Sequence, residues 1–444
     1  MNRLTLEDMA RGLQRGEFSP KELLAAHLSQ IDRVNPQINA FIEVYADASS
    51  AGDGPLAGVP VTVKDSFDIA GKVTSGGSLL RRNEVAREDA VLVDRLKRAG
   101  AVILGKTNLP EFLMNYESDN RIIGRTNNPW SPERTAGGSS GGEAAAIASF
   151  CSAGGLGSDA GGSIREPAHF CGIAGLKPTP GRCPGVGHWP SIAHPGGLLG
   201  VAGPMARTAR DLRLLFRVLA GHDARDPFSV PIELRPAETA GVRVGVMEQF
   251  CDMPVEPVLR EAVRRAARWL GATEEFDPRP LASAPELWWF LFGRVSAQFI
   301  FEMVRGREDE LHWSGIEHVE RHRGDPPTSR EMCEVLAERD RLRAATLTRM
   351  QPTPVILCPA ACVTAFLHRQ RQFRIGGREI GLLDAMTPLT VWNLLGLPAV
   401  TVPIMVSDEG LPAGVQLVGA PYSEELLLDL AVRLEDARGA FHLP

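Results

Sequence analysis

Apolar positions recur at two different spacings along the chain, and these spacings predict helices that alternate with strands. After a capping box at residues 19–22, apolar positions recur between Leu23 and Ile31 at helical spacing. Short β-branched and apolar runs are instead typical of strands. The expected helices are two within 5–43, then 89–99, 143–149, 423–434 and much of 242–350; the expected strands are 58–64, 101–104, 355–358, 399–404 and 414–418. This alternation indicates the α/β class, and the hairpin formed by the last two strands implies a mixed sheet.

The composition is that of a globular protein with an ordinary core. The 444 residues are 44% hydrophobic and 23% charged, and 48 Lys+Arg against 54 Asp+Glu give a formal net charge of −6. A chain without a long basic run lacks the electrostatic footprint of a nucleic-acid surface. We therefore expect no direct contact with nucleic acid.

The cysteines, the N-terminus and the uncharged stretches indicate in which cellular compartment the protein resides. Seven cysteines, with no CxxC pair among them, suggest neither a disulfide framework nor a zinc site. The N-terminus carries acids where a signal peptide has its apolar stretch. The longest stretch without Lys, Arg, Asp or Glu, 183–206, is broken by Pro and Gly. We expect a soluble cytoplasmic protein that enters no membrane.

Glycines are concentrated between residues 134 and 177, where they occur in pairs. A flexible linker is a poor explanation, because a good helix (143–149) and apolar residues such as Ile164 and Phe170 lie between the pairs. Glycine permits positive φ angles and close approach of backbones. This segment is therefore a candidate for functional loops.

Three familiar patterns do not fit their usual structural context. Gly100–Thr107 reads GxxxxGKT, but the expected strand lies between the two glycines instead of before them. Gly155–Ala160 approximates a dinucleotide fingerprint without the acidic residue that should follow. Gly137–Gly141 reads GxSxG after a loop instead of a strand, and the nearby histidines have no distinguishing context: His169, His188 and His194.

Several motifs together resemble the amidase signature family. The glycine-rich part supplies 137–143, 157–167 and 170–179; matching segments lie upstream at 58–65 and 105–108 and downstream at 393–399 and 410–416. The resemblance spans nearly the whole chain and is least clear over 235–355. It implies one large α/β domain over 1–444, with a mixed sheet covered by helices on both faces. Its expected parts are N-terminal helices (1–57), a catalytic core (58–220), a variable helical segment (235–355) and closing strands with a helix (355–444).

The resemblance implies hydrolysis of carboxamides by a Ser–cis-Ser–Lys triad. Carried over by motif, Ser163 is the nucleophile, Ser139 the bridging serine and Lys64 the base, with a cis peptide bond between Gly138 and Ser139. A lysine acts as a base only when neutral, and its reference pKa is ~10.4. Lowering this pKa to ~7.5 requires about 4 kcal/mol of destabilisation of the ammonium, which burial can supply. Lys64 ends an apolar strand, where such burial is expected.

The residues around the nucleophile suggest how the site is supported. Consecutive backbone N–H groups at Ala160, Gly161, Gly162 and Ser163 fit an oxyanion hole. Ser140 is expected either to hydrogen-bond within the relay or to stabilise the loop, and Asp159 and Arg165 are expected to order the loop by charge-assisted bonds. The sequence contains no metal-ligand cluster and no credible cofactor site, so we expect catalysis without either.

Two enzymatic functions remain open. One is a free-standing amidase, a monomer or homodimer, acting on a small to medium amide with an apolar or aromatic acyl part. The other is the amidase (A) subunit of a glutamine-dependent tRNA amidotransferase. A non-catalytic scaffold is disfavoured by the intact Lys64, Ser139 and Ser163. The segment 288–292 either walls a substrate pocket or is a buried helix. A glutamate at position 143, where many members of the family carry a serine, resembles the branch that contains the fatty-acid amide hydrolases.

Overall fold

A long mixed sheet forms the centre of the molecule. The computed structural model describes residues 1–49, 52–192 and 196–444. The sheet has 11 strands in the order β1-β3-β2-β6-β8-β7-β14-β15-β11-β9-β10. These strands are β1 (Phe41–Val44), β2 (Pro60–Lys64), β3 (Val102–Thr107), β6 (Gly154–Asp159), β7 (Ala174–Lys177), β8 (Val201–Ala206), β9 (Val244–Val246), β10 (Glu274–Glu275), β11 (Val355–Pro359), β14 (Ala399–Val406) and β15 (Pro412–Gly419). Two short hairpins lie apart from it: β4 (Asn127–Asn128) with β5 (Ser131–Thr135), and β12 (Gln372–Ile375) with β13 (Arg378–Gly381).

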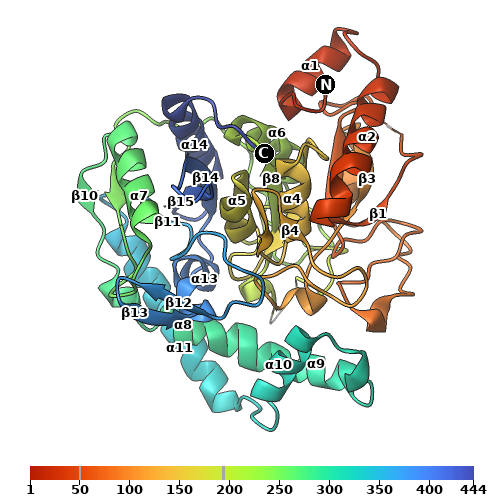
Figure 1. Ribbon diagram of the computed structural model, residues 1–444. Helices are drawn as coiled ribbons and strands as arrows, with labels where there is room; N and C mark the ends of the chain where they lie inside the picture. Colours follow the sequence, from red (N-terminus) through yellow and green to blue (C-terminus); the bar gives the residue numbers. More distant parts are fainter. Residues whose placement is uncertain (50–51, 193–195) are drawn as a thin grey trace.

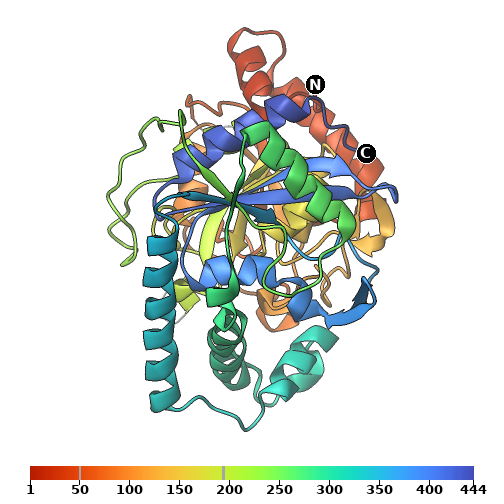
Figure 2. The same ribbon diagram turned by 90° about the vertical axis from the view of Figure 1, so that its left-hand side faces the viewer.

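Helices cover both faces of this sheet, as expected. In Figure 2 the sheet is seen edge-on, with α7 and α14 on one side and α8 and α13 on the other. Helices α6, α7 and α14 share one layer, and α4 and α5 pack against each other and against strands of the sheet. The helices of these layers are α1 (Leu6–Gln14), α2 (Pro20–Ile38), α3 (Val91–Arg98), α4 (Gly141–Ala148), α5 (Arg165–Cys171), α6 (Ala209–Leu219), α7 (Pro257–Leu270), α12 (Leu382–Ala385), α13 (Thr387–Leu394) and α14 (Glu424–Arg438).

The strongest sequence signals correspond to elements close to their expected bounds. Ser19 and Glu22 form the expected capping box at the start of α2, and Thr5 caps α1. The strand expected at 101–104 extends through Thr107, so Lys106 of the GxxxxGKT pattern lies within β3 and pairs with Asp65 at 2.8 Å. Strands β14 and β15 form the expected antiparallel hairpin.

One local expectation was wrong, and another was incomplete. The helical reading of residues 5–43 fails at its end, because Phe41–Val44 is strand β1, antiparallel to β3. Asn39 ends α2 with a left-handed backbone (φ 50°), which turns the chain towards the sheet edge. The charged segment 242–350 is mainly helical, but it also contains β9 and β10, which extend the opposite edge of the sheet.

The rest of the segment 242–350 forms a helical layer along one side of the molecule. Figure 1 shows α8 (Ala284–Trp289), α9 (Ser296–Val304) and α10 (Trp313–Arg321) below the sheet, and α11 (Ser329–Arg349) returning beside them. Residues Phe290–Val295 form a π-helical turn that joins α8 to α9. Within the described residues, no helix is both long and apolar enough to cross a bilayer.

The order of the strands brings the glycine-rich loops together. Strands β2 and β6 are parallel neighbours, so Lys64 at the end of β2 and Asp159 at the end of β6 reach the same edge of the sheet. Helix α4 begins beside them, and it packs so closely that a Cβ at Gly142 would collide with the backbone of Asn108. The glycines therefore serve close packing at this edge, as their clustering suggested.

Candidate active site

Lys64 is a fully buried lysine in contact with two serine hydroxyls. Its Nζ lies 2.7 Å from Ser139 Oγ and 3.1 Å from Ser158 Oγ, and the residue is 0% exposed. Burial lowers the pKa of Lys64 to about 7, against the opposing effect of the nearby Asp159 and Glu143 carboxylates. A substantial fraction of this amine is therefore neutral near neutral pH.

Ser139 stands on a tight turn immediately before α4. The Gly138–Ser139 peptide bond is cis, the geometry that the resemblance implies. The Gly138 N–H donates to Glu166 Oε2 at 2.9 Å, so a buried side chain of α5 holds this turn. The next residue, Ser140, donates its N–H to the Ser163 carbonyl at 3.1 Å. The two loops that carry Ser139 and Ser163 are thus joined directly through their backbones.

Ser163 lies between β6 and α5 and faces a cavity together with Ser139. Its hydroxyl has no hydrogen-bond partner in the part of the chain that the structure describes. The structure therefore contains the Lys64–Ser139 hydrogen bond, while the contact from Ser139 to Ser163 is not made in it. An unpaired hydroxyl at a cavity wall is accessible to a substrate.

Asp159 and Arg165 form a buried ion pair behind the Ser163 loop. Arg165 Nε is 3.0 Å from Asp159 Oδ2, and both side chains are 0% exposed. Burial alone would raise the pKa of the Asp159 carboxyl, but the Arg165 guanidinium outweighs it and holds this pKa below its usual range. Asn393 Nδ2 donates to the same carboxylate at 2.9 Å, which ties the loop to α13. The ion pair and the Asn393 hydrogen bond thus order the start of the loop that carries Ser163.

The loop 160–163 is held on three sides. The Gly162 N–H donates to Asp159 Oδ1 at 2.8 Å, the Tyr116 hydroxyl donates to the Gly161 carbonyl at 2.8 Å, and Trp288 Nε1 donates to the Ala160 carbonyl at 2.8 Å. The Gly162 N–H is thus already engaged, whereas those of Ala160, Gly161 and Ser163 have no partner within the described residues. Three of the four expected oxyanion-hole donors are therefore free.

The contacts of the Ser140 hydroxyl fit the second of its two expected roles, stabilisation of the loop, instead of a bond within the relay. This hydroxyl donates to the Ser158 carbonyl at 3.3 Å and accepts the Ser158 N–H at 3.4 Å. It therefore links the turn before α4 to the end of β6, while the Ser158 hydroxyl contacts Lys64. Sequence reasoning missed Ser158, although its place next to Asp159 at the end of a strand could have pointed to it.

The sequence offered Trp288 as a possible pocket wall, but it indicated neither its hydrogen bond to the Ser163 loop nor the part played by Tyr116, because both are contacts between distant segments. Trp288 lies 128 positions from its partner Ala160 and is 3% exposed. Its ring stacks on that of Phe292 with centroids 4.7 Å apart. The segment 288–292 is thus both buried and part of a cavity wall, so the two alternatives from the sequence are not exclusive.

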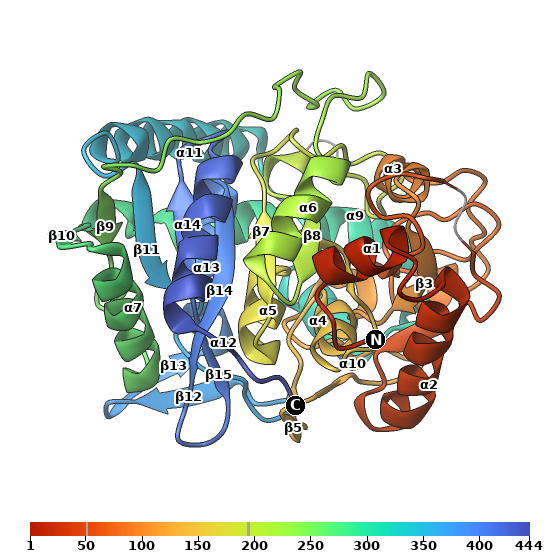
Figure 3. The ribbon, with the colours of Figure 1, turned by 90° about the horizontal axis from the view of Figure 1, so that it is seen from above.

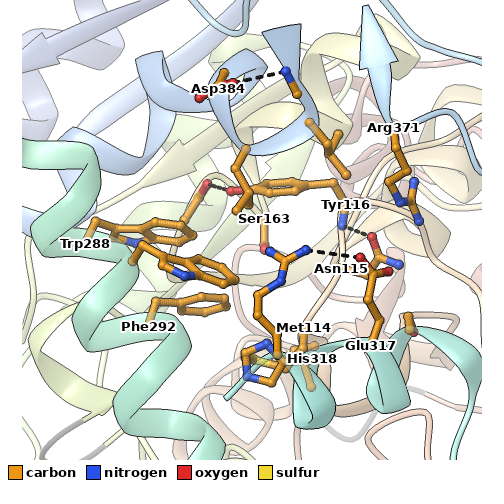
Figure 4. A pocket seen from close by; sticks show the side chains of 18 of the residues that line it. Met114, Asn115, Tyr116, Ser163, Trp288, Phe292, Glu317, His318, Arg371 and Asp384 are labelled. Carbon is orange, nitrogen blue, oxygen red and sulfur yellow. Dashed lines mark hydrogen bonds and ion pairs between the residues drawn. The ribbon is translucent and has the colours of Figure 1, made fainter. Parts of the chain in front are cut away.

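Two cavities meet at Ser163. The polar chamber has a volume of about 480 Å³, and in Figure 4 its aromatic wall of Trp288 and Phe292 faces Arg371 and Glu317 across Ser163. It is lined by 113–116, Gly161, Ser163, Trp288, Trp289, Phe292, Ser314, Glu317, His318, Arg321, Arg371, Gln372 and 381–384. The apolar chamber, about 490 Å³, is lined by 112–114, Ser139, 158–160, Ser163, 188–192, 199–201, Leu291, Phe292, Ser296, Phe299, Ile300 and Met303.

Glu143 is a second buried ionisable group close to Lys64. Its carboxylate accepts hydrogen bonds from Thr107 Oγ1 at 2.7 Å and from Thr62 Oγ1. Burial raises the pKa of Glu143 to about 7, although both hydrogen bonds and the charge of Lys64 oppose the rise. Across the residues described, no group of three or more His, Cys, Asp or Glu side chains is arranged to hold a metal ion.

A buried lysine, adjacent serine hydroxyls and a glycine turn fixed by hydrogen bonds lie together at one end of an α/β sheet, and groups of this kind can activate a hydroxyl for attack on a carbonyl carbon. The comparisons with known proteins identify the family to which the chain belongs. The family model described as Amidase matches residues 22–428, and the chain belongs to this family. It is therefore an amidase-signature hydrolase that acts on amide C–N bonds.

Individual relatives cover nearly the full chain. It is 34% identical over 490 residues to the A subunit of glutamyl-tRNA(Gln) amidotransferase from Methylococcus capsulatus, covering 98% of this chain and 97% of that protein. It is 32% identical over 466 residues to an indoleacetamide hydrolase of Bradyrhizobium diazoefficiens, covering 97% and 86%. A solved structure from a vestigial protein complex that bears on the origins of an s-triazine catabolic enzyme superimposes with TM-score 0.92 at 29% identity, covering 99% and 100%.

Proposed function

We propose that this protein is a free-standing amidase that hydrolyses a carboxamide to a carboxylate and ammonia or an amine through an acyl-enzyme on Ser163. The observation that carries the proposal is the contact of Lys64 Nζ with Ser139 Oγ at 2.7 Å, in a fully buried setting. The pKa of about 7 for Lys64 supports its role as a base.

The first half-reaction transfers the acyl group to the enzyme. Ser163 Oγ attacks the carbonyl carbon while its proton passes to Ser139, whose own proton passes to the neutral Lys64 amine. A C–O bond forms, and the carbonyl π electrons move onto the oxygen. When the tetrahedral intermediate collapses, the C–N bond breaks and the proton returns from Lys64 through Ser139 to the leaving nitrogen. This return matters because an amide nitrogen leaves only once it is protonated.

The second half-reaction releases the acid. Water attacks the ester carbon of the acyl-enzyme, gives its proton to the same relay and breaks the bond to Ser163 Oγ, which recovers a proton. In both half-reactions negative charge develops on the carbonyl oxygen. We propose that the N–H groups of Gly161 and Ser163 stabilise it, with Ala160 and Gly162 completing the turn; a single such donor is worth about 3 kcal/mol. This chemistry requires no metal and no cofactor.

We propose a small to medium substrate with an apolar or aromatic acyl part. The stacked rings of Trp288 and Phe292 lie beside Ser163 in the polar chamber and offer a flat apolar wall. The relative that is named an indoleacetamide hydrolase supports an aromatic acyl part. Seven free cysteines fit the reducing cytoplasm.

The proposal is tested with a fluorophosphonate label and a panel of arylacetyl and alkanoyl amides. We expect stoichiometric labelling of Ser163 and release of acid from at least one amide, and loss of both in Ser163→Ala. Labelling that persists in Ser163→Ala would place the nucleophile elsewhere.

A second candidate function is the A subunit of a glutamine-dependent tRNA amidotransferase, which the 34% identity to such a subunit favours. The free-standing amidase predicts a monomer or homodimer. Purification of the native protein distinguishes the two, since an A subunit elutes with a partner chain and becomes a glutaminase that responds to it.

A further inference from the structure

The two chambers reach Ser163 from different sides, and they do not share the relay. Ser139 and Ser158 line the apolar chamber and are absent from the wall of the polar chamber. Gly161 and Tyr116 line the polar chamber instead. Met114 and Phe292 belong to both walls, so they mark the boundary at which the two cavities meet.

The position of Ser139 decides which chamber receives which half of the substrate. Under the proposed mechanism Ser139 returns the proton to the leaving nitrogen, so this nitrogen must come within hydrogen-bond reach of Ser139 Oγ. Because Ser139 opens only to the apolar chamber, the nitrogen and its substituent lie there. The acyl part then extends into the polar chamber, past the rings of Trp288 and Phe292.

Among the residues that the structure describes, the wall of the apolar chamber offers nothing to hold a charged amine. Of its ionisable lining residues, Asp159 is paired with Arg165, and burial lowers the pKa of His188 to about 3, so that the imidazole is neutral. Most of its wall is made of apolar side chains such as Leu291 and Ile300. A neutral, apolar amine part matches this surface.

The size of the apolar chamber and the residues at its mouth also favour a neutral, apolar amine part. Its volume of about 490 Å³ falls within the range of small-molecule sites, and ammonia would leave it almost unfilled. At the rim, Phe299 is 59% exposed and Met303 is 37% exposed, although both are large apolar side chains. Exposed apolar groups around a cavity are typical of a binding site.

We propose that the enzyme prefers secondary amides whose amine part is an alkyl or arylalkyl group bound in the apolar chamber, over primary amides that release ammonia. This inference rests on the proposed function and adds the substrate class. In the reaction the C–N bond breaks, the electron pair stays on nitrogen, and the proton from Ser139 completes a neutral amine that leaves through the apolar rim.

The test compares two amides with the same acyl group, phenylacetamide and N-butylphenylacetamide, by their kcat/KM values. We expect at least a tenfold preference for the N-butyl amide. Equal cleavage, or a preference for phenylacetamide, overturns the inference and leaves the proposed function standing. If neither amide is cleaved and Ser163 is also not labelled by the fluorophosphonate, the proposed function itself fails. If neither is cleaved although labelling occurs, the assigned substrate class is wrong.

Two variants then locate the preference in the fold. Met303→Trp narrows the apolar chamber and should lower the ratio of kcat/KM between the N-butyl and primary amides at least fivefold. Leu382→Trp is the matched change in the polar chamber, and it should leave this ratio within about twofold because the two substrates share their acyl part. A ratio that responds to Leu382→Trp and not to Met303→Trp reverses the assignment of the chambers.

Discussion

Trp288 donates a hydrogen bond from its indole Nε1 to the carbonyl of Ala160 at 2.8 Å, and so fastens the variable helical segment to the loop that carries Ser163. The bond joins residues 128 positions apart. It fixes the first peptide of the turn whose N–H groups we propose as oxyanion donors. The helical segment thus contributes to the geometry of the site as well as to the cavity wall.

We expect Trp288→Phe to lower kcat about five- to tenfold while the protein remains folded. Phenylalanine keeps an aromatic ring for stacking on Phe292, but it removes a hydrogen bond worth about 1 kcal/mol, which corresponds to this factor in rate. The measurement is kcat, together with the rate of fluorophosphonate labelling. Trp130→Phe is the control, because it removes a similar bond to the Cys171 carbonyl at 2.9 Å, outside both chambers. An equal loss of kcat in both variants would show that the bond at Ala160 has no special role.

We expect Lys64→Met to lower kcat/KM by about 10²- to 10⁴-fold, because it removes the proposed general base and preserves the apolar volume. Lys177→Met is a matched control: Lys177 is equally buried, and burial also lowers its pKa to about 7, but its Nζ bonds to the Pro178 carbonyl instead of a serine hydroxyl. Circular dichroism checks that both variants fold. A Lys64→Met enzyme with full turnover would remove the lysine from the mechanism.

The activity should rise with pH through about 7, because only the neutral form of Lys64 accepts the proton. The Glu143 carboxylate raises the pKa of Lys64, so Glu143→Gln should lower this pKa and move the rise in kcat/KM to lower pH. Glu435→Gln serves as the control. Burial also raises the pKa of Glu435 to about 7, but its carboxylate caps α6 by accepting the Ala209 N–H. The measurement is the pH profile of kcat/KM for the wild-type protein, Glu143→Gln and Glu435→Gln. A shift of the rise to higher pH in Glu143→Gln would contradict the electrostatic argument.

Asp159→Asn should destabilise the protein by about 3–5 kcal/mol, because it leaves the buried Arg165 guanidinium without its counter-charge. Urea unfolding gives the free energy of unfolding. The exposed pair of Arg210 and Asp436 provides a comparison, since Asp436→Asn should cost at most about 1 kcal/mol.

The buried ion pair of Asp159 and Arg165 also predicts an effect of pH on the stability of the protein. The folded-state pKa of Asp159 lies below its unfolded value, so its contribution is complete above the unfolded pKa and is lost as the pH falls through the folded one. The wild-type protein should therefore lose more stability than Asp159→Asn as the solution is acidified below pH ~4. Parallel losses in the two proteins would argue against the ion pair.

Much of the secondary structure was predictable because its signals are local. The capping box of Ser19 and Glu22 and the β-branched run up to Lys64 identified α2 and β2 within a few residues. The strand β1 was missed because four residues next to a helix carry too little periodicity, and their pairing with β3 depends on a distant edge of the sheet. Strands β9 and β10 were missed for the same reason, being only three and two residues long.

The sequence by itself determined the α/β class and, through its motifs, the candidate triad of Lys64, Ser139 and Ser163, because each motif is a short run whose chemistry can be read locally. Only the tertiary structure decided that Lys64 is buried against Ser139 and Ser158, that Trp288 is hydrogen-bonded to the loop that carries Ser163, and that two chambers of different character meet at Ser163. These facts depend on the order of the strands and on packing between segments that are 75 to 128 residues apart. No local pattern of side chains specifies such contacts, since burial and cavity shape arise only when the whole chain has closed around them.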